Sequence, residues 1–326
     1  ALLREEQDRG TLSGSVAILG VPSEEYIDLS GKEELKSRGE IEYFGGKQEL
    51  IRKGYFDGVD MALMTHNLPR TSMNGFDVLI GGLGIGFIAK KVTFLGKESH
   101  AGTAPDRGIN ALNAVMLSLG NINALRETFR EGKGIRVHSI LTEGGEAVNL
   151  IPSKCSLEMH IRGKYLEDLH EVNRKINNCL QAGALATGCN VLITESPGYL
   201  PSIDYPNINA LCGRVCARIL PEGKIGFGSV SGSANDFGDV SQLMTALKIF
   251  TGGVEGDLHT RDFKLADLWM ACVLPAKVLF LTIYELLKNG ASEARRITEE
   301  NTIPLSKDTY FTVLEGVSKR ISHEYM

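Results

Sequence analysis

The most regular pattern in the chain is a set of short apolar runs, each ending in polar or charged side chains. Residues 14–20 form the first run, bounded by glycines, which leads through Val21-Pro22 to Glu24 and Glu25. Residues 59–64 form a second run, and His66 follows it. Short apolar runs bounded by turn residues are typical of buried strands. We therefore predict two buried strands with Glu24, Glu25 and His66 just past their C-terminal ends.

From about residue 87 the pattern changes to alternating strands and amphipathic helices. The predicted strands are 87–95, 135–142, 156–162 and 190–195, and the predicted helices are 110–129 and 165–185. The resulting order, β-α-β-β-α-β, is the ferredoxin-like arrangement. A complete unit of this kind between two incomplete α/β segments indicates an inserted domain, which we place at residues 87–201.

The flanking segments, residues 1–86 and 202–326, are predicted to form the two parts of one open-sheet α/β domain. Its expected elements are helices at 32–38, 47–53, 207–220 and 265–287 and a further strand at 243–251. The side chains that the last helix is expected to bury are Trp269, Cys272, Ala276, Leu279 and Ile283. Beyond it we expect only polar helices. The first ten residues resemble the polar end of a helix, so we expect this domain to be N-terminally incomplete.

Composition narrows the function without identifying it. The chain has 326 residues, of which 43% are hydrophobic and 23% charged, as in an ordinary globular protein. Its net charge of −5, with no lysine- or arginine-rich block, argues against a nucleic-acid partner. The most apolar segment, 265–287, contains Asp267, Lys277 and Glu285, which favours a buried helix over a membrane span. Six cysteines without a CxxC pair imply no disulfide framework, and we predict a cytoplasmic location.

The glycine-rich segment GGLGIG, residues 81–86, raises the possibility of a nucleotide site. It does not fit the GxGxxG fingerprint, and a strand is predicted after it where that motif needs a helix. A nucleotide-binding protein is therefore the least favoured interpretation. The glycines are better explained by a crossing between the two domains, where the backbone must bend.

Four side chains of the outer domain, Glu24, Glu25, His66 and His259, fall at predicted strand ends or loops. Taken singly, each is better explained as a solvated loop or helix-start residue. Neighbouring residues of an extended chain point in opposite directions, so one glutamate can hold a metal while the other faces a water molecule. Mixed histidine and carboxylate ligands suit Zn²⁺ or Mn²⁺. Their coincident positions predict a metal site.

Seven ordered motifs resemble the metallo-aminoacylase and carboxypeptidase family. They are PSEE, MTH, SHAGTAP, EGGEAVNLIP, the arginine of EMHIRG, SGSANDFGDVS and LHTRDF. The similarity extends from about residue 10 to residue 290 and is greatest to the amidohydrolase branch, which includes aminobenzoyl-glutamate hydrolases and N-acyl-amino-acid hydrolases. It implies a metallopeptidase catalytic domain with an inserted dimerisation domain, and a homodimer. The expected reaction is hydrolysis of the amide bond of an N-acyl amino acid, a dipeptide or an aminobenzoyl-glutamate-like compound.

The resemblance also implies a metal centre and a base. The family site holds two divalent ions, Zn or Mn. The matching ligands in this chain are Glu25, His66 and His259. Glu24 would be the general base that activates water and relays its proton to the leaving nitrogen.

The remaining implied roles concern substrate and transition state. His100 would reach the partner subunit's cleft and stabilise the oxyanion. Asn149 and Arg162 would bind the substrate's carboxylate or carbonyl, and Gly232 and Ser233 would form part of a backbone cradle. The other polar residues have simpler expected roles: helix caps for Asp236 and Asp239, strand positions for His138 and His160, and solvated helix positions for His170 and His323.

One departure from the family pattern supports a second hypothesis of a different class. Relatives take further metal ligands from an earlier Cys-Gly-His-Asn or His-x-Asp segment, and neither motif occurs in this sequence. Glu25, His66 and His259 alone could not fully coordinate two ions. The alternative is a catalytically incompetent fragment or homologue that acts as a binding or dimerisation module.

Overall fold

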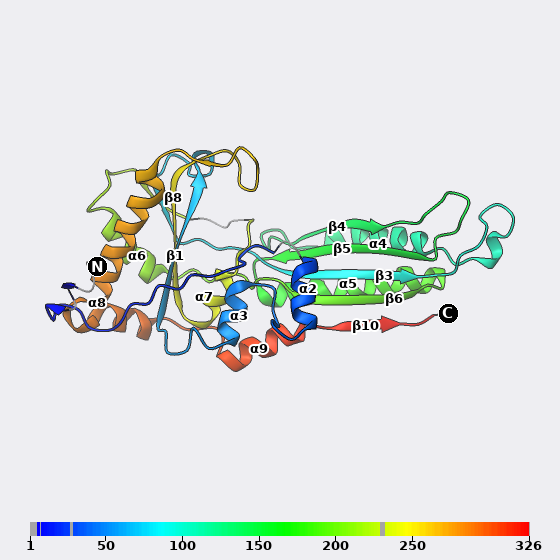
Figure 1. The fold of residues 1–326 in the computed structure, drawn as a ribbon, viewed down its shortest axis with the longest axis horizontal. Helices are drawn as coiled ribbons and strands as arrows, with labels where there is room; N and C mark the ends of the chain where they lie inside the picture. Colours follow the sequence, from blue (N-terminus) through cyan, green and yellow to red (C-terminus); the bar gives the residue numbers. More distant parts are fainter. Residues whose placement is uncertain (1–4, 7, 27–28, 229–231, 326) are drawn as a thin grey trace.

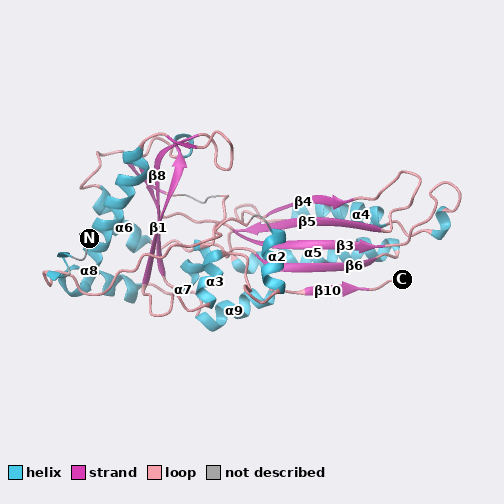
Figure 2. Ribbon diagram, in the orientation of Figure 1, coloured by secondary structure: helices cyan, strands magenta, loops and turns pink. Residues whose placement is uncertain are grey.

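The computed structural model describes residues 5–6, 8–26, 29–228 and 232–325. Within these ranges the chain forms two five-stranded sheets, one toward each end of an elongated molecule (Figure 1, Figure 2). Each sheet has its own hydrophobic core. The architecture is therefore α/β with a separate α+β unit, as predicted.

The first sheet is mixed and belongs to the outer segments of the chain. Its strands are β1 (Met61–Pro69), β2 (Val78–Ile80), β7 (Ile225–Phe227), β8 (Thr245–Glu255) and β9 (Lys264–Leu265). The order is β1-β8-β2-β7, with β9 paired to β8. β1 runs parallel to β8, whereas β2 runs antiparallel to β8 and parallel to β7. The helices of this part are α2 (Leu29–Ser37), α3 (Gly46–Arg52), α6 (Pro206–Cys216), α7 (Phe237–Leu243), α8 (Leu274–Glu300) and α9 (Lys307–Gly316).

The second sheet contains the predicted ferredoxin-like unit. Its strands are β3 (Gly86–Leu95), β4 (Arg136–Glu143), β5 (Lys154–Gly163), β6 (Asn190–Pro197) and β10 (Arg320–His323), in the order β10-β6-β3-β5-β4. Helices α4 (Ala111–Leu125) and α5 (Leu166–Thr187) pack on one face, against the buried alternate residues of the strands. Asn110 caps α4 by accepting hydrogen bonds from the N–H groups of Leu112 and Asn113. The predicted order of elements is confirmed.

The chain passes between the sheets in the segments before β3 and after β6. Residues 81–85, which carry most of GGLGIG, join β2 to β3, so the prediction of a crossing without a following helix is confirmed. The return segment is tied to the first by hydrogen bonds, including Gly84 N–H to Ser202 Oγ at 2.5 Å and Ser202 N–H to the Gly84 carbonyl at 3.0 Å. The two connections therefore lie side by side and form a joint between the domains.

The C-terminal segment makes a third connection that the sequence pattern did not predict. Residues 320–323 form β10, which pairs antiparallel with β6 at the edge of the second sheet (Figure 1). The prediction of only polar helices after residue 287 is wrong here. His323 consequently lies on a strand and not on a solvated helix, and His170 on α5 is half-buried. A strand of four residues gains its stability from the neighbouring strand, and local periodicity does not report such pairing.

The prediction of a buried strand at residues 14–20 is also wrong. These residues have no strand conformation, and the side chain of Ile18 is 98% exposed. The segment is held near its start, where Leu12 bridges Lys288 and the N–H of Ser13 donates to the carbonyl of Leu287. An apolar run becomes a buried strand only where a neighbouring strand pairs with it and another layer packs over it.

The long apolar helix begins later and buries a different face than predicted. A π-helical turn, Trp269–Val273, precedes α8, and residues 288–291 of α8 have non-helical backbone angles. Trp269, Cys272 and Ala276 are exposed. Leu279 and Ile283, the other two predicted positions, are half-buried. The fully buried positions are Leu274, Pro275, Val278, Thr282, Leu286 and Ile297. By length and composition alone residues Trp269–Glu300 could cross a membrane, a test that core helices also pass, and the buried face of α8 belongs to the core of the first sheet.

Candidate active site

Three segments that are distant in sequence meet beside the joint between the sheets. The PSEE segment contacts the start of α3, where the N–H of Gly46 donates to the carbonyl of Ser23 at 3.2 Å. A β-carbon at Gly46 would lie 2.0 Å from the carbonyl oxygen of Pro22, so the Gly-Gly turn permits this approach. Lys47 then reaches the third segment, residues 232–239, through its backbone N–H and its ammonium group, which lie 2.9 and 2.5 Å from the Asp236 carboxylate.

Glu24 and Glu25 project into different surroundings, as adjacent residues of an extended segment should. Glu24 is half-buried, and its pKa is raised first by burial and then by the negative charges of Asp236 and Glu25. Glu25 is exposed, and its Oε1 lies 3.7 Å from Nδ1 of His259. The structure thus brings together three of the predicted site residues: both glutamates and His259.

His259 owes its position to the tight loop between β8 and β9. It adopts a left-handed backbone conformation, φ +64°, which is uncommon for a residue other than glycine. At Gly256, in the same loop, a β-carbon would lie 2.2 Å from the carbonyl oxygen of Asp262. The loop therefore depends on glycine for its closure, and its closure holds His259 beside Glu25.

His66 is not gathered with the other candidate ligands. β1 continues past it to Pro69, so His66 lies within the strand, opposite Phe250 of β8, and not at the strand's mouth as predicted. A catalytic zinc site uses three protein ligands and one open position. In the described ranges, no three His, Cys, Asp or Glu side chains lie close enough to hold one ion. Glu25 and His259 could be two of the three protein ligands of such a site, and no third ligand lies beside them among the described residues.

Asp236 and Asp239 are buried and do not act as side-chain caps of α7, so that prediction is wrong. Asp236 pairs with Lys47. Asp239 accepts hydrogen bonds from Gln48 Nε2 at 3.0 Å, the Tyr310 hydroxyl at 3.0 Å and the backbone N–H of Leu200 at 3.2 Å. Burial raises the pKa of Asp239 to about 7. Both aspartates join segments that are remote in sequence, which a local capping pattern does not reveal.

Arg162 lies at the joint end of the second sheet, in an aromatic cluster. Its guanidinium lies 5.4 Å from the ring centre of Phe87, the residue paired with it on β3. Tyr26 stacks edge-on against Phe87 with ring centres 5.0 Å apart, and the hydroxyl of Tyr199 donates to the carbonyl of Glu24. Tyr26 and Tyr199 thus connect PSEE to the second sheet. Sequence reasoning missed both, because nothing local distinguishes them from core tyrosines.

His100 and Asn149 lie together at the opposite end of the same sheet. His100 bridges Leu150, and the N–H of Ala101 donates to the carbonyl of Asn149 at 2.9 Å. Nδ1 of His100 accepts from the N–H groups of Gly102 and Thr103, both at 3.1 Å, which leaves Nε2 as the outward nitrogen of an exposed ring. Eight residues of β5 separate this end from Arg162, or roughly 27 Å of strand.

Gly232 and Ser233 lie at the boundary of the two sheets. The N–H of Ile85 donates to the carbonyl of Ser233 at 3.1 Å. A β-carbon at Gly232 would lie 3.5 Å from a terminal guanidinium nitrogen of Arg136, at the start of β4. The predicted backbone cradle therefore faces the joint end of the second sheet.

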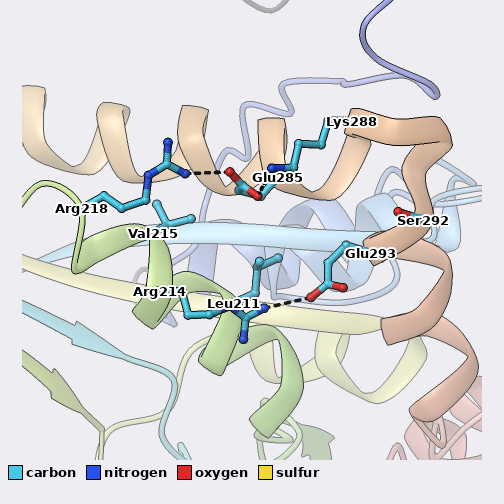
Figure 3. Close-up of a pocket in the computed structure, with 8 residues that line it drawn as sticks. All are labelled: Leu211, Arg214, Val215, Arg218, Glu285, Lys288, Ser292 and Glu293. Carbon is cyan, nitrogen blue, oxygen red and sulfur yellow. Dashed lines mark hydrogen bonds and ion pairs between the residues drawn. The ribbon is translucent and has the colours of Figure 1, made fainter.

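A separate surface pocket of about 390 Å³ lies between α6 and α8 (Figure 3). Its charged side chains bind one another: Arg218 pairs with Glu285 at 2.7 Å and Arg214 with Glu293 at 2.9 Å. None of the candidate site residues lines it. The pocket carries no part of the predicted chemistry.

Sequence comparison identifies relatives for each part of the chain. Residues 86–187 match the peptidase dimerisation domain of the M20 family. The chain is 31% identical over 257 residues to the Xaa-Arg dipeptidase of Mus musculus, covering 74% of this chain and 56% of the relative. It is 29% identical over 147 residues to one subunit of the p-aminobenzoyl-glutamate hydrolase of Escherichia coli, covering 45% of this chain and 29% of that subunit. The chain thus spans about half, or less, of the length of these relatives.

Solved structures show the same fold at lower identity. A putative aminohydrolase from methicillin-resistant Staphylococcus aureus superposes with a TM-score of 0.70 at 17% identity, over 88% of this chain and 70% of that one. An aminobenzoyl-glutamate utilization protein from Klebsiella pneumoniae gives a TM-score of 0.59 at 16% identity, over 92% and 65%. Sequence and fold therefore agree with the resemblance read from the seven motifs.

Proposed function

We propose that this chain, which belongs to the M20 family of amidohydrolases and peptidases, forms part of a hydrolase acting on the amide bond of a small amino-acid derivative. The substrate would be an N-acyl amino acid, a dipeptide or an aminobenzoyl-glutamate-like compound. The relatives' names, a dipeptidase, an aminobenzoyl-glutamate hydrolase and a deacetylase, support this bond type. The observation that carries the proposal is the convergence of Glu24, Glu25 and His259 beside residues 232–239.

Glu24 is the proposed general base. Water attacks the carbonyl carbon of the amide, Glu24 accepts the proton that the water releases, and the same carboxyl group then gives that proton to the leaving nitrogen. The half-buried position beside Asp236 and Lys47 suits a carboxyl group that must exchange a proton, because its charged form is not fully solvated and forms no direct ion pair with any described residue.

Arg162 is the proposed anchor for the substrate's carboxylate. Its planar guanidinium can pair with a carboxylate through two parallel hydrogen bonds. Arg162 lies at the joint end of the second sheet, across from the PSEE segment, with Tyr26 and Phe87 between them, and this position supports the proposed role. Gly232 and Ser233 would line the same space from the outer domain.

His100 and Asn149 are proposed to act in the partner subunit's site. They lie at the end of the sheet remote from Glu24, so they do not reach the site of their own chain. β4 is the edge strand of the sheet, and the side chains of Ile140 and Leu141 are 64% and 49% exposed. If two copies pair through β4 about a two-fold axis, the strands run antiparallel. The His100 end of one sheet then lies toward the Arg162 end of the other.

A divalent metal, Zn or Mn, is part of this proposal on family grounds. Glu25 and His259 would belong to its ligand set, with His66 as the third predicted member. Because the described residues do not complete that set, the proton transfers above are assigned to Glu24 without a step through the ion. Metal content of the natural full-length protein, compared with its Glu25→Gln and His259→Gln variants, tests the assignment. Unchanged metal content in both would remove these two ligands.

Substitution of Glu24 tests the base. In the natural full-length protein, Glu24→Gln should lower kcat for an N-acyl amino acid by about 10²–10⁴-fold while metal content stays the same. Glu33→Gln, a substitution of an exposed glutamate on α2, is the matched control and should leave kcat unchanged. Retained activity in Glu24→Gln would rule out this role for Glu24.

Subunit mixing tests the proposed trans arrangement. Glu24→Gln and His100→Ala homodimers should each be inactive. When the two are unfolded together and refolded as a mixture, half of the dimers are hybrids with one intact site, so about a quarter of the wild-type activity should return. If both residues act within one chain, no activity returns.

A second function, a binding or dimerisation module without catalysis, is favoured by one observation. The described residues gather only two of the candidate ligands. On this hypothesis the purified 326-residue chain dimerises but contains almost no Zn or Mn. Stoichiometric metal in that chain would exclude it.

A further inference from the structure

Two arginines lie side by side at the joint end of the second sheet. Arg136 on β4 pairs directly with Arg162 on β5 in the antiparallel register, and His138 pairs in the same way with His160. Because alternate residues of a strand share a face, all four side chains lie on the face opposite α4 and α5. The histidine rings are 5.7 Å apart, and the ring of His160 lies 4.8 Å from Phe87.

Neither guanidinium is paired with a carboxylate of the described residues. In the described part of the chain, no Asp or Glu oxygen lies within 4.0 Å of Arg136 or Arg162. Nε of Arg162 is buried and has no hydrogen-bond partner there. Like charges directly opposite one another on neighbouring strands are destabilising, and burial together with Arg136 lowers the pKa of Arg162. Such a pair is stabilised when an anion binds between or beside the two groups.

The pair faces the proposed substrate space. Arg136 lies next to Gly232, at the start of the segment that carries Asp236. Arg162 lies on Phe87, which contacts Tyr26, two residues after Glu24. Two guanidinium groups therefore border the same space as the proposed base.

We propose that Arg136 is a specificity-determining residue that binds a second carboxylate, so that the substrate is an N-acyl derivative of an acidic amino acid of the glutamate or aspartate type. This inference rests on the proposed function, because it takes Arg162 as the anchor of the first carboxylate. The two carboxyl groups of such an amino acid are two or three carbons apart, and two neighbouring guanidinium groups can bind both. A basic side chain in the same place would face two like charges.

Binding measurements test this without requiring turnover. N-acetyl-glutamate, N-acetyl-glutamine and N-acetyl-arginine are titrated into the full-length protein by calorimetry. We expect N-acetyl-glutamate to bind at least tenfold more tightly than the other two. Arg136→Gln should weaken the binding of N-acetyl-glutamate by 10- to 100-fold and that of N-acetyl-glutamine by less than threefold. Arg136→Lys, which keeps the positive charge, should bind N-acetyl-glutamate more tightly than Arg136→Gln does. Arg174→Gln, on the exposed face of α5, is the control and should change neither.

The outcomes separate this inference from the hydrolase proposal. The role of Arg136 would be overturned if Arg136→Gln bound N-acetyl-glutamate and N-acetyl-glutamine with equal losses of affinity, or if the wild type bound N-acetyl-arginine more tightly than N-acetyl-glutamate. Either result would count even if the protein hydrolyses these compounds. Arg136-dependent binding of N-acetyl-glutamate without hydrolysis of any derivative would support the acidic-ligand site and count against the hydrolase.

Discussion

Each sheet of this protein buries a lysine, and the two lysines are held in different ways. Lys90, on β3 of the second sheet, pairs with Glu195 of β6, and Asn177 of α5 accepts a hydrogen bond from it at 2.7 Å. Lys248, on β8 of the first sheet, has no carboxylate within 4.0 Å among the described residues and donates to the hydroxyl of Ser202 at 2.8 Å. Burial lowers the pKa of each lysine to about 8.

The difference shows which segments of the chain supply the hydrogen-bond and ion-pair partners in each part of the molecule. The partners of Lys90 all belong to the inserted domain, which satisfies its buried charge from its own elements. Lys248 depends on Ser202, in the segment that joins the domains. The candidate site has the same dependence, because Glu24 is held by Tyr199, and Lys47 by Asp236. The inserted domain satisfies its buried lysine with its own residues and receives only the edge strand β10 from outside, whereas the site exists only where separate segments meet.

The largest expected effect comes from breaking the ion pair inside the inserted domain. Glu195→Leu leaves Lys90 buried without its carboxylate and should lower the free energy of unfolding by about 3–5 kcal/mol in urea denaturation. Replacing both partners, Lys90→Met with Glu195→Leu, removes the unpaired charge and should recover most of that loss. A double variant as unstable as Glu195→Leu would mean that the ion pair is not the source of the effect.

A smaller effect, visible as a pH dependence, is expected for Lys248. Its pKa is about 8 in the folded protein and near 10.5 in an unfolded chain, so the unfolded state binds more protons between these values. The free energy of unfolding should therefore rise by up to about 3 kcal/mol between pH 8 and 10.5 through this group. Lys248→Met should show a shallower rise than wild type. Lys264→Met, on exposed β9, should show the wild-type rise, and identical curves for all three proteins would contradict the assignment.

The smallest effect tests the link between the C-terminal segment and the site. Tyr310, on α9, is fully buried and donates to Asp239 of α7. Tyr310→Phe removes this one hydrogen bond and should lower the free energy of unfolding by about 1–2 kcal/mol, measured in urea. Tyr55→Phe, at a residue that is 60% exposed, serves as the control and should be neutral. A neutral Tyr310→Phe would indicate that Gln48 and the Leu200 N–H already satisfy Asp239.

Most of the inserted domain could be predicted because its elements are specified locally. The stripe that includes Val115 and Ile122 and the strand alternation at 155–161 both report burial against neighbours within the same domain. The outer domain was predicted less well for the corresponding reason. The conformation of residues 14–20 and the choice of the buried face of α8 depend on which strands and helices lie beside them. The local sequence pattern does not specify these neighbours.

The candidate site divides in the same way. The motifs around Glu24, Arg162 and His259 could be recognised from the sequence, because they occur in the order of the motifs of the family that the chain resembles. The grouping of Lys47 with Asp236, and of Arg136 with Arg162, could not be, because each pair joins segments that approach only in the folded chain.

By itself, the amino-acid sequence determined the order of elements in the inserted unit and supplied the candidate site residues, since these follow from periodicity and from short motifs along the chain. Only the tertiary structure decided which of them meet. It placed His259 beside Glu25, left His66 apart within β1 and set His100 at the far end of the sheet from Arg162. Distances between remote segments depend on the packing of whole layers, which no single stretch of sequence specifies.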